Sequence, residues 1–238
     1  MTVVTLHRRE RLAERVYQAL RQEIVDGRLM PDSQISEQDV AARLKVSRTP
    51  LREALVRLVE EGLAVVYPQF GTFVAPIRLE AVMEAQFVRE HLECALIREA
   101  AARADARAIR RFRDNLAGQS RAADDNDHAA FYTLDEELHA GFAEAAGRPG
   151  VWRLIQQSKV QMDRVRLLSL PMNRQLPLLI EQHRAIVDAL AKGDADEAEA
   201  ALRGHLREVF ATAKTLGLED EASADLPKRR RRAAPSED

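Results

Sequence analysis

The 238-residue sequence predicts a mainly α-helical protein with an N-terminal winged helix-turn-helix and a C-terminal all-α antiparallel helical bundle. Two observations support this fold class. Apolar residues recur at helical spacing along most of the chain, whose length suits two domains. The exception is residues 63–74, where β-branched and aromatic residues flank a glycine-containing loop, as in a β-hairpin. The predicted divisions are residues 1–76, residues 77–217 and a disordered charged tail at residues 218–238.

Two helices are expected before residue 46. Residues 9–26 place apolar side chains at i, i+4 spacing, and Gly27 ends this amphipathic helix. After a turn at Pro31-Asp32, Ser36 with Asp39 three residues later resembles a capping box. The second helix is therefore expected to begin just after Ser36.

The third helix and the wing follow directly. Ser47 is expected to cap a helix that tolerates Pro50 in its first turn and that ends at Gly62. Strands are expected at residues 63–67 and 72–74, joined by the loop Pro68-Gln69-Phe70-Gly71. Three helices and a two-stranded wing make a winged helix-turn-helix.

Basic and short polar residues stand at the start of the third helix, where a recognition helix contacts base edges. Arg48 has the donors to bind guanine O6 and N7, and Arg52 lies one turn further on the same side. Ser47 and Thr49 suit phosphate contacts near a helix N-terminus, and Gly71 lets the wing backbone approach a groove. The alternative is a solvated charged face on a small helical domain.

Composition restricts where and how the protein acts. The formal net charge of −2 means that DNA binding depends on where basic residues lie and not on a basic chain. There is no apolar run of about 18 residues that would span a membrane, and residues 1–14 have no signal-peptide core. The one cysteine, Cys94, fits a reducing cytoplasm and is expected to be a packed helix residue.

Residues 79–216 are expected to form about six helices without strands, in an antiparallel bundle. Sequence breaks fall at residues 124–127, 147–150, 171–177 and 193–194. Few aromatic residues are present, so the core is expected to consist of Leu, Ile, Val and Ala.

Four polar side chains are expected to converge inside this bundle. Asp135 and His139 share an apolar helix face, and His183 and His205 lie on apolar faces of two later helices. These two histidines are each about 15–17 Å from the turn at residues 193–194, so they face each other in an antiparallel pair. Three imidazoles suit Zn, Ni or Co, and the carboxylate leaves Mn and Fe open. The alternative is four unrelated buried polar residues.

Residues 9–75 resemble the N-terminal domain of GntR-type bacterial transcriptional regulators. The matching segments are Ile24-Val25-Asp26-Gly27-Arg28-Leu29, Val46 to Leu55, Leu58-Val59-Glu60-Glu61-Gly62-Leu63 and Gly71-Thr72-Phe73-Val74. The resemblance implies that Ser47, Arg48, Thr49, Arg52 and Gly71 contact double-stranded DNA. The chain departs from the family at Pro31-Asp32, where Pro-Gly is usual, and at Gln38, where some members place a base-contacting arginine. The preferred operator is expected to differ at the base that Gln38 faces.

Residues 79–216 resemble the FCD ligand-sensing domain of the FadR branch of that family. Asp135-x-x-x-His139, Glu181 to Ile186 and His205-Leu206 match its metal-ligand pattern. The resemblance implies a divalent metal, commonly zinc or nickel, and a small organic acid effector such as a sugar acid, a hydroxy acid or a dicarboxylate. Arg89 matches a position where members place an arginine, which can grip a carboxylate. Arg164 and Arg166 are weaker candidates, with a surface or salt-bridged role as the alternative.

These expectations together describe a cytoplasmic, metabolite-responsive regulator, most simply a repressor, that binds a palindromic operator as a homodimer. Two other functions stay open. One is a metal sensor, in which the ion itself is the signal. The other is a metallohydrolase with an accessory domain, for which no general base accompanies the four residues. The basic run Lys228 to Arg232 in the tail is expected to be solvated or to add non-specific phosphate attraction.

Overall fold

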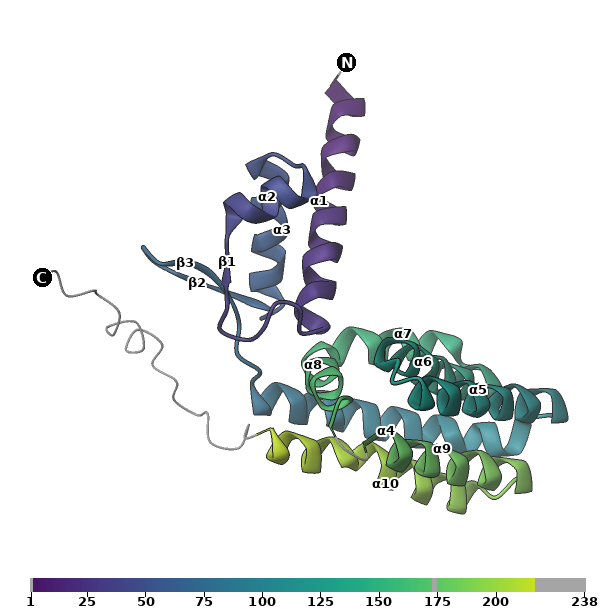
Figure 1. Ribbon diagram of the computed structural model, residues 1–238. Coiled ribbons are helices and arrows are strands. Elements are labelled where there is room, and N and C mark those ends of the chain that lie inside the picture. The colour runs from purple at the N-terminus through teal and green to yellow at the C-terminus, as the bar shows by residue number, and fades with distance from the viewer. Residues whose placement is uncertain (1, 173–174, 217–238) are drawn as a thin grey trace, which may run out of the picture.

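A small winged domain stands over one end of a layered helical bundle in the computed structural model, which describes residues 2–172 and 175–216 (Figure 1). None of the helices in this described part has the length and apolarity that crossing a membrane requires. In chain order the elements are α1 (Thr2–Val25), β1 (Gln34–Ile35), α2 (Glu37–Leu44), α3 (Arg48–Glu60), β2 (Ala64–Tyr67), β3 (Gly71–Val74), α4 (Leu79–Arg103), α5 (Ala106–Asp124), α6 (His128–Ala145), α7 (Pro149–Ser158), α8 (Val160–Ser169), α9 (Gln175–Lys192) and α10 (Ala195–Thr215).

Helices α1, α2 and α3 enclose the core of the winged domain. Leu20 and Ile24 of α1 pack with Leu51 and Leu58 of α3, and Val74 of β3 closes the core from the wing. Helix α1 begins well before the predicted residue 9, because neither proline nor glycine interrupts the chain before Gly27.

The wing contains a third strand that the sequence did not reveal. β1 pairs antiparallel with β3, which also pairs with β2, so the strand order is β1-β3-β2. A strand of two residues is too short to produce an alternating pattern. The hairpin turn is the predicted one, with Gln69 at φ 68° and Gly71 at φ 105°.

The two predicted helix caps differ in their chemistry. The Ser36 hydroxyl accepts a hydrogen bond from the Asp39 backbone N–H at 3.2 Å, as predicted. Ser47 occupies the N-cap position of α3, but its hydroxyl makes no capping hydrogen bond. The predicted side-chain cap is therefore wrong. The third residue of the helix is Pro50, which has no N–H to donate a hydrogen bond to the Ser47 hydroxyl.

The bundle has one helix more than the approximate six that were expected, with α4 to α10 in the described residues. All four predicted breaks are present, and further ones fall at Ala104-Asp105 and at Lys159. Asp105 caps α5 through the Ala108 N–H, and Asp194 caps α10 through the Glu197 N–H. The predicted tail at residues 218–238 lies outside the described residues.

Helix α8 lies between the two parts of the chain, below the end of α1 (Figure 1). Its Val160 packs against the core of the winged domain, and its Met162 and Val165 pack with α4 and α10. β3 ends at Val74 and α4 begins at Leu79, so the domain boundary predicted at residues 76–77 falls in the connecting segment and stays a prediction.

Candidate metal centre and nucleic-acid interface

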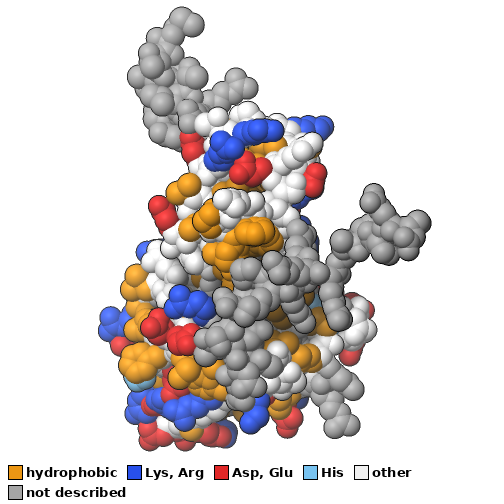
Figure 2. All heavy atoms as spheres, turned by 90° about the vertical axis from the view of Figure 1, so that its left-hand side faces the viewer, with side chains coloured by type: hydrophobic (Ala, Val, Ile, Leu, Met, Phe, Trp, Pro, Cys, Tyr) orange, Lys and Arg blue, Asp and Glu red, His pale blue; other side chains and the backbone are white. Residues whose placement is uncertain are grey.

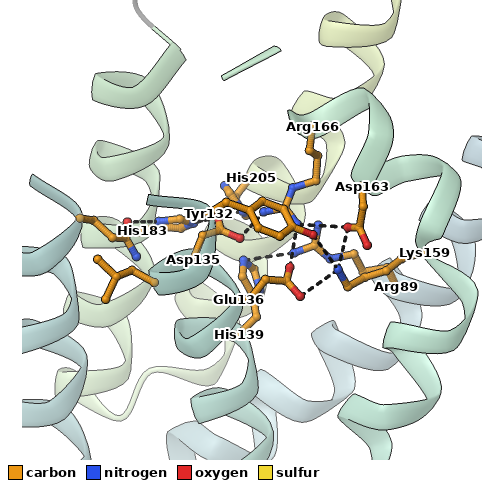
Figure 3. Close-up of polar contacts among 12 residues, drawn as sticks. Arg89, Tyr132, Asp135, Glu136, His139, Lys159, Asp163, Arg166, His183 and His205 are labelled. Carbon is orange, nitrogen blue, oxygen red and sulfur yellow. Dashed lines mark hydrogen bonds and ion pairs between the residues drawn. The ribbon is translucent and has the colours of Figure 1, made fainter. Parts of the chain in front are cut away.

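Asp135, His139, His183 and His205 converge in the interior of the bundle (Figure 3). One ligand atom from each lies within 4.8 Å of all the others, and all four side chains are buried. Asp135 and His139 are one turn apart on α6, while α9 supplies His183 and α10 supplies His205. The two C-terminal histidines meet at one level of an antiparallel pair, as their distances from Gly193 predict.

The protonation of His183 and His205 follows from their outer partners. His183 Nδ1 lies 2.8 Å from Gln119 Oε1, and His205 Nδ1 lies 2.9 Å from Gln182 Oε1. An amide oxygen only accepts, so each Nδ1 carries the proton and each Nε2 carries a lone pair. The Gln119 amide nitrogen donates to Asn115 Oδ1 at 2.8 Å, which fixes this orientation.

His139 is also protonated on Nδ1, but the partners of its ring are the charged residues Arg89 and Glu93. Arg89 Nη2 donates to His139 Nε2 at 3.1 Å, so Nδ1 carries the proton that points to Glu93 Oε2 at 2.5 Å. Arg89 also pairs with Glu93. Burial opposes ionisation of Glu93, but Arg89 and then His139 outweigh it and lower the pKa of Glu93 to about 2. The three imidazoles thus direct their Nε2 atoms into the cluster.

Asp135 completes the cluster with an oxygen that lacks a partner. Its Oδ2 accepts from Arg166, whereas its buried Oδ1 has no hydrogen-bond partner among the described residues and lies 3.4 Å from His183 Nε2. Burial lowers the pKa of His183 to about 3 and that of His205 well below its ordinary value, so both rings are neutral near pH 7. Bare nitrogen and carboxylate lone pairs that face one another fit a bound cation.

A buried ion network adjoins the cluster, and the sequence did not indicate it (Figure 3). Arg166 also pairs with Glu136 at 2.9 Å, and Lys159 pairs with Glu136 at 2.8 Å and with Asp163 at 2.6 Å. Desolvation by burial raises the pKa of Asp163. Glu136 lies on α6, Asp163 and Arg166 lie on α8, and Lys159 lies between α7 and α8. Spacing alone does not separate a buried charge from a solvated one at these positions.

Arg89 and Arg166 reach the cluster, and Arg164 does not. The Arg164 guanidinium points the other way and donates to the Ala75 carbonyl oxygen at 2.6 Å and to Gln161 Oε1 at 2.9 Å. This position does not support the effector contact predicted for Arg164, because residues two apart on a helix face nearly opposite sides.

A small cavity lies beside the cluster. It has a volume of about 30 Å³, and Arg89, Arg166, His205 and Thr212 are among the residues that line it. This volume holds little more than a water molecule. Any ligand larger than water therefore needs side chains that line the cavity to move.

The residues predicted to contact DNA are exposed around the start of α3 and on the wing. Ser47, Arg48 and Thr49 are all solvent-exposed, and Gln38 is exposed in the first turn of α2. Arg52 is exposed but pairs through its Nε with Glu37 Oε2 at 3.0 Å. Figure 2 shows Lys and Arg side chains gathered at the upper end of one face, over the winged domain.

The wing tip is held by a residue that sequence reasoning missed. Gln34 of β1 donates through its amide nitrogen to the Phe70 carbonyl oxygen at 3.0 Å. A Cβ at Gly71 would lie only 3.2 Å from that nitrogen, and the φ of 105° at Gly71 also favours glycine. Gly71 is thus required for the shape of the wing, whether or not it contacts DNA.

A winged helix-turn-helix with exposed arginines around the start of α3 is typical of a DNA-binding protein, and the comparisons with known proteins agree. The family of bacterial regulatory proteins called gntR matches residues 12–74, and the FCD domain matches residues 84–208. A regulator in an unstable DNA locus of Streptomyces ambofaciens is 39% identical over 195 residues, 82% of each chain. The transcriptional repressor RspR of Escherichia coli strain K12 is 33% identical over 221 residues, 92% of this chain and 97% of that one.

Solved structures show the same arrangement. A putative GntR regulator from Rhodococcus sp. RHA1 superposes with a TM-score of 0.69 at 28% identity and covers 86% of this chain and 97% of its own. McbR/YncC of Escherichia coli has the same fold, with a TM-score of 0.71 at 21% identity over 87% and 98% of the two chains.

This chain belongs to the GntR family of bacterial transcriptional regulators and contains an FCD domain. It is a transcriptional regulator and not an enzyme, because its family and its relatives are regulators. The metallohydrolase interpretation is thereby set aside.

Proposed function

We propose that this regulator is a homodimeric repressor that binds a palindromic operator, and that a small carboxylate bound over a divalent metal controls the binding. The observation on which the proposal chiefly rests is the convergence of Asp135, His139, His183 and His205, with three Nε2 lone pairs directed into the cluster and an orphan carboxylate oxygen. Two relatives favour repression over activation: the repressor RspR of Escherichia coli, and a protein of Paenarthrobacter nicotinovorans described as the probable repressor of a D-xylose utilization operon.

The proposed DNA contacts are Arg48 and Arg52 to base edges, Ser47 and Thr49 to phosphates, and Gly71 at the wing. Exposure of these residues in one region supports this assignment. The Ser47 hydroxyl makes no capping bond in its own helix, which leaves it for a phosphate oxygen. Gln38, exposed on α2, would contact a base of the operator.

The proposed metal ligands are the carboxylate of Asp135 and the Nε2 atoms of the three histidines. Zinc or nickel suits this donor set best. When bound, the ion supplies a Lewis-acidic site for a carboxylate oxygen. Glu93, Gln119 and Gln182 hold the three rings in the ligating tautomer, the usual role of a residue behind a metal-bound histidine.

The proposed effector contacts are Arg89 and Arg166. In the described structure these arginines hold His139 and Asp135, which are two of the four proposed ligands. A metal held by His139 Nε2 would displace the Arg89 donor from that nitrogen, and Arg89 could then donate to a carboxylate. Arg166 stays beside it on Asp135 Oδ2 and Glu136. The buried groups around the site include one more carboxylate than cations, so a divalent ion makes the region net positive and favours an anionic ligand. The set comprises Glu93, Asp135, Glu136 and Asp163 against Arg89, Lys159 and Arg166.

The proposed dimer face lies on α4 and α10. Met83 and Phe87, one turn apart on α4, are 52% and 65% exposed, and Phe210 at the neighbouring end of α10 is 39% exposed. The two helices pack together, with Glu90 of α4 paired to Arg207 of α10. Apolar side chains grouped on one exposed face are typical of an interaction surface.

A test needs an operator duplex, which the wild-type chain can select from a random pool. Fluorescence anisotropy then gives its operator affinity as metal-free protein, with zinc or nickel, and with metal plus a panel of sugar acids, hydroxy acids and dicarboxylates. The proposal expects an acid to change operator affinity only in the presence of metal. A full response to metal alone would instead favour a metal sensor, and no response to any combination contradicts the proposal.

A further inference from the structure

Helix α8 holds the winged domain through two side chains that bind backbone carbonyl groups. The Gln161 amide nitrogen donates to the Gly62 carbonyl oxygen at 3.0 Å, and the Arg164 guanidinium donates to that of Ala75 at 2.6 Å. Arg164 also donates to Gln161 Oε1 at 2.9 Å, so the two side chains act as one unit.

Both acceptors lie at the base of the DNA-binding elements. Gly62 directly follows the C-cap residue of α3, and Ala75 directly follows β3. The Ala75 N–H donates to the Leu63 carbonyl oxygen at 3.0 Å, which joins these two ends to each other. A contact at this point therefore sets the direction of the recognition helix and of the wing together.

Packing alone does not explain why a charged residue occupies position 164. Its side chain is 1% exposed, and it takes part in none of the ion pairs between described residues. Burial lowers the pKa of its guanidinium to about 10, which still leaves it charged near pH 7. The Asp32 carboxylate partly offsets the burial, but the hydrogen-bond acceptors of Arg164 are neutral oxygens, and such a buried cation is unfavourable compared with an apolar residue of similar size. Such a group gives directional hydrogen bonds that an apolar side chain cannot provide.

The opposite side of α8 faces the cluster of Asp135 and the three histidines. Arg166 pairs with Asp135 and Glu136, and Asp163 pairs with Lys159. Arg164 and Arg166 are separated by about 200° around the helix axis. Helix α8 is thus bonded to the winged domain on one side and to the cluster on the other.

We infer that Gln161 and Arg164 are positioning residues for operator binding: they fix the orientation of the winged domain on α8, so that the two recognition helices of a dimer are spaced for a palindromic operator. This inference rests on the proposed dimer and operator. It makes one distinctive prediction, because orientation matters when two half-sites are bound together and not when one half-site is bound alone.

The test compares Arg164→Met with wild type on a palindromic duplex and on a half-site duplex, both taken from the selected operator. Affinity for the palindrome is expected to fall by about ten-fold or more, and affinity for the half-site is expected to stay unchanged. Arg164→Lys keeps a donor for the Ala75 carbonyl and is expected to recover part of the loss, and Gln161→Met is expected to lose palindrome affinity as Arg164→Met does. Arg153→Met is the matched control and should change neither affinity, because Arg153 is an exposed arginine of α7 that lines a surface cleft together with Gln161.

Unchanged palindrome affinity in Arg164→Met would overturn the inference, and so would an equal loss on both duplexes. A second measurement applies even if the wild type does not favour a palindrome, which is a failure of the proposed function. Spin labels at Ala42→Cys and Ala117→Cys, both exposed positions, report the distance between winged domain and bundle in a Cys94→Ala background. Labelled chain is diluted with unlabelled chain so that only pairs within one chain contribute. Arg164→Met should broaden the distance distribution, and an unchanged width overturns the inference.

Discussion

The Nε2 atoms of His183 and His205 lie 3.3 Å apart in the interior of the bundle, and each ring donates its Nδ1 proton to a glutamine oxygen. Two acceptor nitrogens that face each other at this distance repel unless a proton or a metal ion lies between them. The lowered pKa of both histidines argues against the proton near neutral pH. The pair is therefore arranged for a metal.

Removal of a proposed ligand should weaken metal binding. Asp135→Ala and His183→Ala are each expected to retain less zinc or nickel than wild type after gel filtration against a chelator, because each loses one of the four proposed ligands. Elemental analysis of the desalted protein measures this content. His91→Ala, at an exposed histidine of α4, is the control and should keep full occupancy. Full metal content in either ligand variant would show that the site is misassigned.

The glutamine behind His183 should tune metal affinity without binding the ion. Gln119→Leu removes the acceptor of the Nδ1 proton, so the ring loses its fixed tautomer and orientation. Metal affinity is expected to fall by about 10- to 100-fold, as measured by competition with a chelator of known affinity. Gln157→Leu changes an exposed glutamine of α7 and should have no effect. Equal affinities of Gln119→Leu and wild type would count against the assigned tautomer.

The sequence predicted the features that depend on local spacing. The periodic apolar positions gave the two-domain helical architecture, and equal distances from Gly193 placed His183 opposite His205. It did not predict contacts made across the fold. Glu93 lies on α4, more than 40 residues before its partner His139, and Gln34 reaches the wing from a strand of two residues. Such partners depend on tertiary packing, which leaves no periodic pattern in one sequence.

Arg48 should determine base preference at one operator position. Arg48→Ala is expected to weaken specific binding by about 1–3 kcal/mol and to relax selectivity at that base, because a bidentate contact to guanine is lost. Anisotropy titrations against operators with each base pair at every position measure both effects. Arg113→Ala, at an exposed arginine of α5, serves as the control. Intact specific binding by Arg48→Ala would contradict the proposed recognition helix.

A charge on the proposed dimer face should separate the subunits. Phe87→Glu places a carboxylate among Met83, Phe210 and their counterparts in a second copy, where it loses water without gaining a partner. Sedimentation velocity is expected to show a monomer with an unchanged helical circular dichroism spectrum, since Phe87 is 65% exposed in the single chain. Leu154→Glu changes a residue of similar exposure, 57%, on α7 and should remain dimeric. A dimeric Phe87→Glu variant would place the interface elsewhere.

The metal-free protein should lose stability as the pH falls from about 6.5 towards 5, because buried neutral histidines bind protons only after unfolding. Burial lowers the pKa of His183 to about 3 and also lowers that of His205, so in this window the unfolded chain takes up protons that the folded chain does not. Each histidine then reduces the free energy of unfolding by up to about 1.4 kcal/mol per pH unit. Urea denaturation at a series of pH values gives this slope. His205→Asn keeps a donor near Gln182 but cannot titrate, so its slope should be smaller, and an equal slope in this variant would argue that His205 is already protonated in the fold.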